Sequence, residues 1–197
     1  MTGGGKIERG SLLSLEAYAR QRGDFRTRVI SHKKNRKVEL GDHVALAFED
    51  ELTIRYQIQE MLRIERVFEE DGIQGELEAY NPLVPDGRNF KATMMIEYPD
   101  PAERKRMLAR LKGVEDRVWV RVEGFERVYA VADEDLEREN EEKTSSVHFL
   151  RFELSEPMAQ ALKQEAQLAV GVDHPEYRAE IPALPRNVRD SLVGDLA

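Results

Sequence analysis

The segment 117–132 constrains the fold of this chain more than any other, because its side chains alternate strictly between two kinds. The alternation sets three valines against two arginines and a tryptophan, namely Val118, Val120 and Val122 against Arg117, Trp119 and Arg121. Successive side chains of a β-strand point to opposite faces of the sheet, so the valine face should be buried. A turn around Gly124 and a return strand over 127–132 complete the pattern. The segment therefore predicts an antiparallel hairpin.

The rest of the chain mixes further hairpins with helices. A second hairpin is predicted over 37–48 around Gly41-Asp42, and single strands are predicted over 90–97 and 146–154. Helical periodicity is expected over 11–22, 24–35, 50–70, 72–80, 101–112, 155–168 and 185–196. Helices and strands do not alternate regularly. The expected class is α+β, with a mostly antiparallel sheet built from hairpins, N-terminal helices and one long central helix.

Length and composition limit the number of domains and the classes of site that the chain can contain. A chain of 197 residues favours one domain, which we place at 11–197 behind a flexible arm at 1–10, with a possible seam at 133–145. The chain has no cysteine, which excludes thiolate nucleophiles and cysteine-held metal clusters. No apolar run is long enough to cross a membrane, and the N-terminus lacks the apolar segment of a secretory signal. We expect a soluble, cytoplasmic protein.

Motifs with a known chemistry are missing from the sequence. Gly3-Gly4-Gly5-Lys6 lacks the spacing and the following hydroxyl of a phosphate-binding loop. The four histidines form neither H-x-H nor H-E-x-x-H, so spacing indicates no metal site, and no cofactor is indicated.

Charge is distributed unevenly along the chain. Arg20 to Lys37 contain eight basic residues and one acidic residue, whereas Asp133 to Lys143 contain seven acidic and two basic residues. Both stretches are typical of solvated faces. The alternative is an anion or nucleic-acid binder that uses 20–37, but only Phe25 could stack on a base there, so nucleic acid is unlikely.

Two side chains with polar groups fall among apolar positions. Glu65 lies near the centre of the helical stripe that contains Ile54, Ile58 and Leu62, and a buried carboxylate needs a partner. His148 shares a strand face with Leu150, Phe152 and Leu154. Each residue can be a satisfied structural group or part of a site. Glu60, Glu65 and His148 are therefore the candidate catalytic residues, and the sequence leaves open whether the chain is an enzyme.

The opposite face of the same helix also carries large side chains. Tyr56, Gln59, Glu60 and Arg63 follow helical spacing. Either a second layer of the same domain covers this face or a partner does. Together with the loop from Asn81 to Pro85, it is the surface we expect to contact another protein or a second copy of the chain.

Four stretches resemble the bacterial domain-of-unknown-function family 3501. They are Tyr56-Gln57-Ile58-Gln59-Glu60-Met61-Leu62-Arg63, Tyr80-Asn81-Pro82-Leu83-Val84-Pro85, Ala92-Thr93-Met94-Met95-Ile96-Glu97 with Asp100-Pro101, and Ser146-Val147-His148-Phe149-Leu150-Arg151-Phe152. The resemblance covers nearly the whole chain after about residue 9 and carries over no catalytic residue.

The resemblance implies a cellular context. Members of that family tend to be encoded beside a rubrerythrin-like protein and an iron–sulfur oxidoreductase, which implies a cytoplasmic accessory to peroxide or iron redox chemistry. The leading hypothesis is thus a non-catalytic accessory or interaction protein of such a system. The alternatives are a metal-binding protein or enzyme with a Glu/His site, and an anion or nucleic-acid binder.

Overall fold

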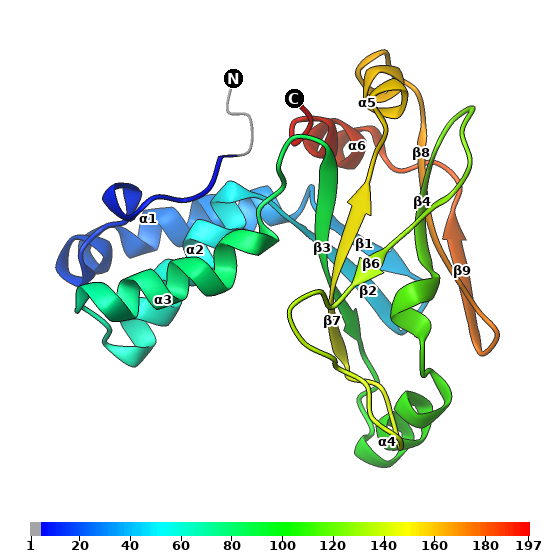
Figure 1. The fold of residues 1–197 in the computed structure, drawn as a ribbon, viewed down its shortest axis with the longest axis horizontal. Helices are drawn as coiled ribbons and strands as arrows, with labels where there is room; N and C mark the ends of the chain where they lie inside the picture. Colours follow the sequence, from blue (N-terminus) through cyan, green and yellow to red (C-terminus); the bar gives the residue numbers. More distant parts are fainter. Residues whose placement is uncertain (1–4) are drawn as a thin grey trace.

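Residues 5–197 are described by the computed structural model (Figure 1). Its helices are α1 (Leu15–Lys33), α2 (Glu51–Glu65), α3 (Glu70–Tyr80), α4 (Pro101–Arg110), α5 (Glu156–Lys163) and α6 (Arg186–Val193). Its strands are β1 (Lys37–Leu40), β2 (Val44–Glu49), β3 (Asn89–Ile96), β4 (Val118–Val122), β5 (Val128–Tyr129), β6 (Val131–Ala132), β7 (Val147–Glu153), β8 (Leu168–His174) and β9 (Tyr177–Ile181). The class is α+β.

Two antiparallel sheets enclose the larger hydrophobic core. The strand orders are β1-β2-β3-β7-β6 and β5-β4-β8-β9. The segment 128–132 enters both sheets, because β5 pairs with β4 and β6 pairs with β7. At the other edges, the Tyr177 hydroxyl on β9 accepts a hydrogen bond from the backbone N–H of His43 at 3.0 Å and donates one to the carbonyl of Leu40. The sheets are thereby joined at both sides of the core.

The predicted hairpin at 117–132 is confirmed. β4 pairs antiparallel with β5, and Val118, Val120 and Val122 are fully buried in the core between the sheets. The hairpin at 37–48 is confirmed as β1 and β2, in which Val44, Leu46 and Phe48 are buried. In both hairpins apolar side chains recur at every second position of a strand. Only one pairing register therefore turns all of them toward the core.

Helices α1, α2 and α3 lie side by side next to the sheets (Figure 1). They enclose a second, smaller core, whose buried members are Ile7, Leu12, Ile54, Ile58, Leu62, Ile73, Leu77 and Val84. The apolar stripe of α2 supplies Ile54, Ile58 and Leu62 to this core, as its helical spacing predicts.

The single long helix predicted at 50–70 is two helices. Asp50 begins α2 with a capping box to Thr53, and Arg66 ends it in the left-handed conformation, at φ 54°. The chain then turns, and α3 starts at Glu70. Ile64 and Phe68, which the unbroken stripe would bury, are exposed instead, with Phe68 at 72%. The longest helix is α1, at the edge of the group, with 19 residues.

Helix α1 runs straight through the predicted break at Gly23-Asp24. A glycine inside a helix costs about 1 kcal/mol, which tertiary contacts can offset. Here Tyr18 and Val29, on either side of the glycine, are both buried, and Arg22 is paired with Glu60 on α2. These contacts hold both halves of α1 in one line.

The described part of the N-terminal arm, residues 5–10, is held against the helices. Ile7 is buried in the smaller core, its backbone N–H donates to Asn81 Oδ1 at 2.8 Å, and its carbonyl accepts from Asn81 Nδ2 at 3.0 Å. Ile7 thus anchors this segment, which composition alone does not reveal, and the flexibility of the arm at 1–10 stays a prediction. Residues 1–4, which contain Gly3 and Gly4 of the glycine run, lie outside the described residues.

Candidate functional site

The face of α2 that was expected to bind a partner is covered by the chain itself. Gln59 is 1% exposed; its Oε1 accepts from the backbone N–H of Leu13 at 2.7 Å, and its Nε2 donates to the Leu13 carbonyl at 3.3 Å. Tyr56 meets Phe25 of α1 edge-on at 5.9 Å. The second layer of the same fold therefore covers Gln59 and packs on Tyr56, while binding of a partner to the parts of this surface that are still exposed stays a prediction.

Glu60 ties α1 to α2. Its carboxylate accepts hydrogen bonds from the Tyr18 hydroxyl at 2.7 Å, from Arg22 at 2.7 and 3.1 Å, and from Arg63 at 3.3 Å. The Arg22 hydrogen bond is the main reason that the pKa of Glu60 is lowered to about 2. Arg63 is exposed, and Tyr56 and Glu60 are partly exposed. These contacts give Glu60 a structural role in joining the two helices.

Replacing Glu60 with glutamine should lower the free energy of unfolding by about 2 kcal/mol at pH 7, because a carboxylate with a lowered pKa stabilises the folded state. That stability is present above the ordinary pKa of 4.5 and is lost as the pH falls toward about 2. Urea unfolding of the variant should therefore depend less on pH in this range. The matched control is Glu16→Gln, which breaks the exposed pair with Arg20 and should change stability by about 0.5 kcal/mol or less. An equal loss in both variants would contradict this account.

The remaining residues of the expected surface also have internal roles. Asn81 binds the backbone of Ile7, as described above, and Pro85 is buried. Glu65 is exposed and, among residues 5–197, has no hydrogen-bond or ion-pair partner. The hypothesis of a buried carboxylate at Glu65 is wrong, because α2 ends at this residue and its last turn emerges into solvent.

The basic stretch 20–37 is not a uniform solvated face. Arg36 is 2% exposed and donates to the carbonyls of Phe48, Glu49 and Ser191 and to the carboxylate of Asp195 at 2.5 Å. It joins the end of β2 to α6. Burial raises the pKa of Asp195 to about 6 although Arg36 opposes this shift.

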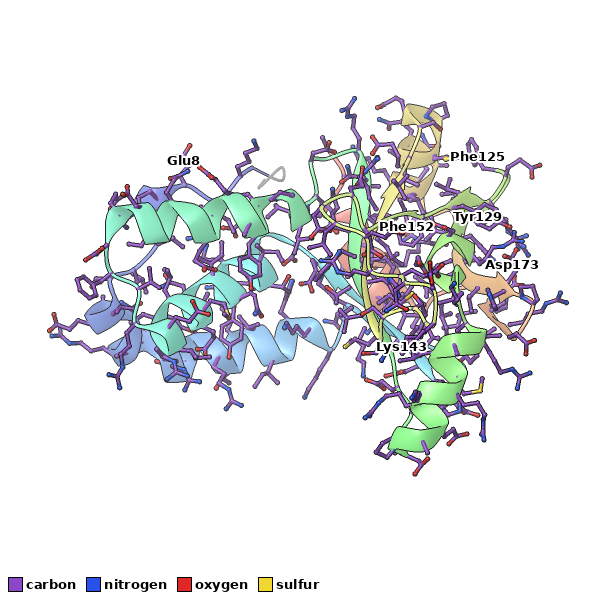
Figure 2. All side chains as sticks on the ribbon, turned by 60° about the horizontal axis from the view of Figure 1, so that its bottom comes forward. Glu8, Phe125, Tyr129, Lys143, Phe152 and Asp173 are labelled. Atoms are coloured by element: carbon purple, nitrogen blue, oxygen red, sulfur yellow. The ribbon has the colours of Figure 1, made fainter. Side chains whose placement is uncertain are left out.

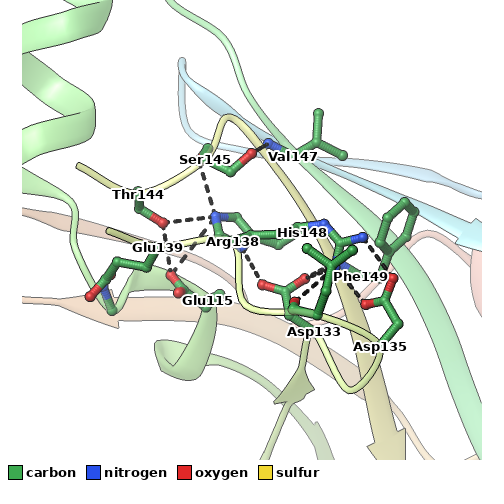
Figure 3. A network of polar contacts seen from close by, with 12 residues as sticks. Glu115, Asp133, Asp135, Arg138, Glu139, Thr144, Ser145, Val147, His148 and Phe149 are labelled. Carbon is green, nitrogen blue, oxygen red and sulfur yellow. Dashed lines mark hydrogen bonds and ion pairs between the residues drawn. The ribbon is translucent and has the colours of Figure 1, made fainter. Parts of the chain in front are cut away.

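His148 lies in a second cluster of polar and charged side chains. It is fully buried on β7, between Asp133 on one side and Thr144 with Glu115 on the other (Figure 3). Its Nδ1 lies 2.6 Å from Asp133 Oδ2. Its Nε2 lies 3.0 Å from Thr144 Oγ1, 3.0 Å from the Ser145 carbonyl oxygen and 3.9 Å from Glu115 Oε2.

Asp133 is fixed by the edge of the first sheet. It follows β6 in the left-handed conformation, at φ 51°, which aspartate tolerates better than most residues. Its backbone N–H donates to the carbonyl of Phe149 at 2.8 Å, and its Oδ1 accepts from the Phe149 N–H and from Arg138. Both oxygens of this carboxylate are therefore engaged, one of them by His148.

Glu115 approaches the same histidine from the turn before β4. It is 8% exposed, and burial raises its pKa. Thr144 is also buried, and its hydroxyl lies 3.4 Å from Glu115 Oε2. Carboxylate oxygens of Glu115 and Asp133 and a ring nitrogen of His148 all lie within 4.8 Å of one another.

The acidic stretch 133–143 forms the wall beside this cluster. A cavity of about 460 Å³ opens there and is lined mainly by carboxylates, including Glu115, Asp133 and Glu139. Arg138 lies against it, bonded to Asp135 at 2.6 and 2.8 Å and stacked on the Phe149 ring at 4.6 Å. The strong negative charge of this wall favours approach by a cation rather than by an anion.

The contacts of His148 Nε2 and Thr144 Oγ1 are hydrogen bonds, and their lengths are also compatible with the spacing between neighbouring ligands of a bound metal ion. Bonds of 2.0–2.2 Å place neighbouring ligands of a tetrahedral or octahedral ion roughly 3 to 3.5 Å apart. The distances from Nε2 to Thr144 Oγ1 and to the Ser145 carbonyl, and from Thr144 Oγ1 to Glu115 Oε2, fall in this range. The distance from Nε2 to Glu115 Oε2, 3.9 Å, is slightly wider. A carboxylate on the other ring nitrogen, here Asp133, is typical of metal-binding histidines.

Comparison with known proteins places the chain in a family. A family model with the description "Protein of unknown function (DUF3501)" matches residues 6–196. The chain belongs to this family. The DUF3501 chain is also similar to a solved structure, the crystal structure at 1.90 Å of a novel protein of unknown function from Burkholderia pseudomallei K96243. The two are 56% identical, with a TM-score of 0.93 over 98% of this chain and 100% of the other. No curated protein matches the chain.

Among residues 5–197, no helix of this chain is both long and apolar enough to span a bilayer.

Proposed function

We propose that the protein binds a divalent transition-metal ion through His148 Nε2, Glu115 and Thr144, with Asp133 orienting the histidine. The observation that carries the proposal is that carboxylate oxygens of Glu115 and Asp133 and a ring nitrogen of His148, supplied by three separate segments, lie within 4.8 Å of one another beside an acidic cavity. Isolated buried carboxylates are costly, and a cation is one way to offset that cost at Glu115.

The donor set narrows the class of ion. It offers imidazole nitrogen, carboxylate oxygen, hydroxyl oxygen and a backbone carbonyl, and no sulfur from cysteine. Such donors suit Zn²⁺, Fe²⁺ and Mn²⁺ rather than the soft Cu⁺. Arg138 contacts Asp133 but not Glu115, so an ion at Nε2 would leave the Arg138 contacts in place.

Equilibrium dialysis tests the proposal directly. Protein stripped with a chelator should take up one Zn²⁺, Mn²⁺ or Fe²⁺ per chain, the last under anaerobic conditions. His148→Gln and Glu115→Gln should each weaken binding at least 100-fold, and Asp133→Asn should weaken it about 10- to 100-fold as a residue that orients a ligand. The matched control is His174→Gln, because His174 is a buried histidine that contacts only backbone groups.

Variants at these buried positions could fail to fold, so a second experiment uses the unaltered protein. Its free energy of unfolding is measured with and without metal. Saturation at about 100 times the dissociation constant should raise the free energy of unfolding of the unaltered protein by about 2.7 kcal/mol. Failure to bind any of the three ions, or equal binding by His148→Gln and the native chain, would overturn the proposal and leave the network a structural one.

The accessory role in rubrerythrin-type redox chemistry stays a prediction. A site for Fe²⁺ or Mn²⁺ is compatible with that role, but part of the α2 face expected to contact the partner is covered by α1 and the segment before it. The cytoplasmic location, an oligomeric state and the absence of nucleic-acid binding stay predictions too.

A further inference from the structure

The outer face of the second sheet is unusually rich in guanidinium groups. In the register of β4, β8 and β9, Val118 lies opposite Val172 and Asp173 lies opposite Arg178. The side chains of Asp173 and Arg178 therefore form one row on the outer face, and Arg117 immediately precedes β4. Trp119, Gly171 and Glu180 form the next row.

The indole of Trp119 lies flat across β8. A Cβ at position 171 would stand 2.3 Å from a ring carbon of Trp119, so only glycine leaves room for the ring. The guanidinium of Arg127 lies over the ring at 4.0 Å from its centre. These contacts leave the side chain 1% exposed, although it is on the face that points away from the core.

Two buried polar atoms in this place have no partner within residues 5–197, namely Trp119 Nε1 and Asp173 Oδ1. The other oxygen of Asp173 is engaged, since it accepts from Arg127 at 3.0 Å and from Tyr129 at 2.6 Å. Tyr129 and Asp173 are labelled in Figure 2, where they lie at the same side of the molecule. A buried donor and a buried acceptor left unpaired each cost free energy, so both need a partner.

Trp119 and Asp173 both line a pocket of about 530 Å³, which we call the Trp119 pocket; its lining also includes Arg117, Arg127, Arg178 and Glu180. Arg127 is paired with Asp173, but Arg117 and Arg178 make no ion pair or hydrogen bond with any described residue. The pocket thus presents two free cationic forks, one unsatisfied N–H and one unsatisfied carboxylate oxygen.

We infer that the Trp119 pocket binds a small oxyanion that also carries a hydroxyl group, the chemistry shared by hydroxy acids and phosphate esters of polyols. The anionic oxygens would pair with Arg117 and Arg178, whose planar forks match carboxylate and phosphate. An oxygen of the ligand would accept from Trp119 Nε1, and its hydroxyl would donate to Asp173 Oδ1. A simple anion leaves Asp173 unsatisfied, and a simple polyol leaves both arginines unpaired.

Trp119 is the only tryptophan of the chain, so its fluorescence reports on this pocket alone. Titration with glycerol phosphate tests the phosphate esters of polyols, and titration with lactate tests the hydroxy acids. Inorganic phosphate supplies the anion without the carbon-bound hydroxyl group, and glycerol supplies hydroxyl groups without the anion. We expect a saturable change with glycerol phosphate or lactate that is at least tenfold tighter than with phosphate, and none with glycerol. Arg178→Gln and Arg117→Gln should each weaken binding at least tenfold.

The control Arg26→Gln makes the same change of charge on an exposed arginine of α1 and should leave binding unchanged. Because Arg117 and Arg178 are exposed, their variants should fold normally. A fluorescence that none of the four compounds changes, or a change that Arg178→Gln and Arg26→Gln affect equally, would overturn the inference. This outcome is independent of the metal site, which is built on other residues.

Discussion

Replacing Arg36 with methionine should lower the free energy of unfolding by about 3 to 5 kcal/mol at neutral pH, the range for breaking a buried ion pair. Methionine fills a similar length but leaves the Asp195 carboxylate and the carbonyls of Phe48 and Ser191 without their donor. Denaturant unfolding followed by circular dichroism measures the change. A loss below about 1 kcal/mol would show that Arg36 does not join α6 to the rest of the fold.

The loss in Arg36→Met should depend on pH with a defined sign. The folded-state pKa of Asp195 is raised to about 6, so the stability linked to its proton is complete below its unfolded pKa of about 3.9 and is lost as the pH rises through 6. Removing Arg36 raises this pKa further, so the variant should be closer to the native chain at about pH 5 than at about pH 8. Adding Asp195→Asn should recover part of the loss at high pH, as a double-mutant cycle measures.

Gly171→Ala should cost about 3 kcal/mol, at the upper end for an overpacked site. The new Cβ would stand 2.3 and 2.6 Å from two ring carbons of Trp119 and 3.0 Å from the backbone carbonyl of Ala179. The backbone cannot yield easily because β8 is paired on both sides, so the indole must lift. Trp119 fluorescence should therefore shift to the red together with the loss of stability.

Gly75→Ala is the matched control for Gly171→Ala. Position 75 lies within α3, and an added Cβ meets no atom within 4 Å. Alanine should raise stability there by about 0.5 to 1 kcal/mol, because it favours a helix more than glycine does. If Gly171→Ala behaves like this control, the indole does not lie on β8 as described.

The strands could be predicted from the sequence because their apolar side chains recur at every second position, and only one register buries all of them on the same face. Val118, Val120 and Val122 are the clearest case, and His148 with Leu150 and Phe152 is another. The helices were predicted less well where tertiary contacts and backbone conformation determine where a helix begins or ends. The apolar period of α2 continues in sequence to Phe68, but Arg66 adopts a left-handed conformation, which periodicity does not indicate.

The candidate site was predicted only in part, since its residues are close in space and not in sequence. His148 could be singled out as a polar group on an apolar face. Asp133 lies at the start of the acidic stretch, where neighbouring carboxylates conceal it, and Glu115 lies in a turn with no periodic signal. Gln59 and Glu60 were singled out correctly as unusual, but their partners are Leu13, just before α1, and Tyr18 on α1, and the sequence does not reveal where this segment lies.

Anomalous scattering from crystals of the metal-loaded protein tests the central claim most directly. Data collected on both sides of the absorption edge of zinc or manganese locate that ion without any assumption about its ligands. We predict a single anomalous peak in the first coordination range, about 2.0 to 2.3 Å, of His148 Nε2 and a Glu115 oxygen, with Asp133 still bonded to Nδ1. A crystal that takes up the ion elsewhere, or that shows no peak beside His148 at saturating metal, would contradict the account.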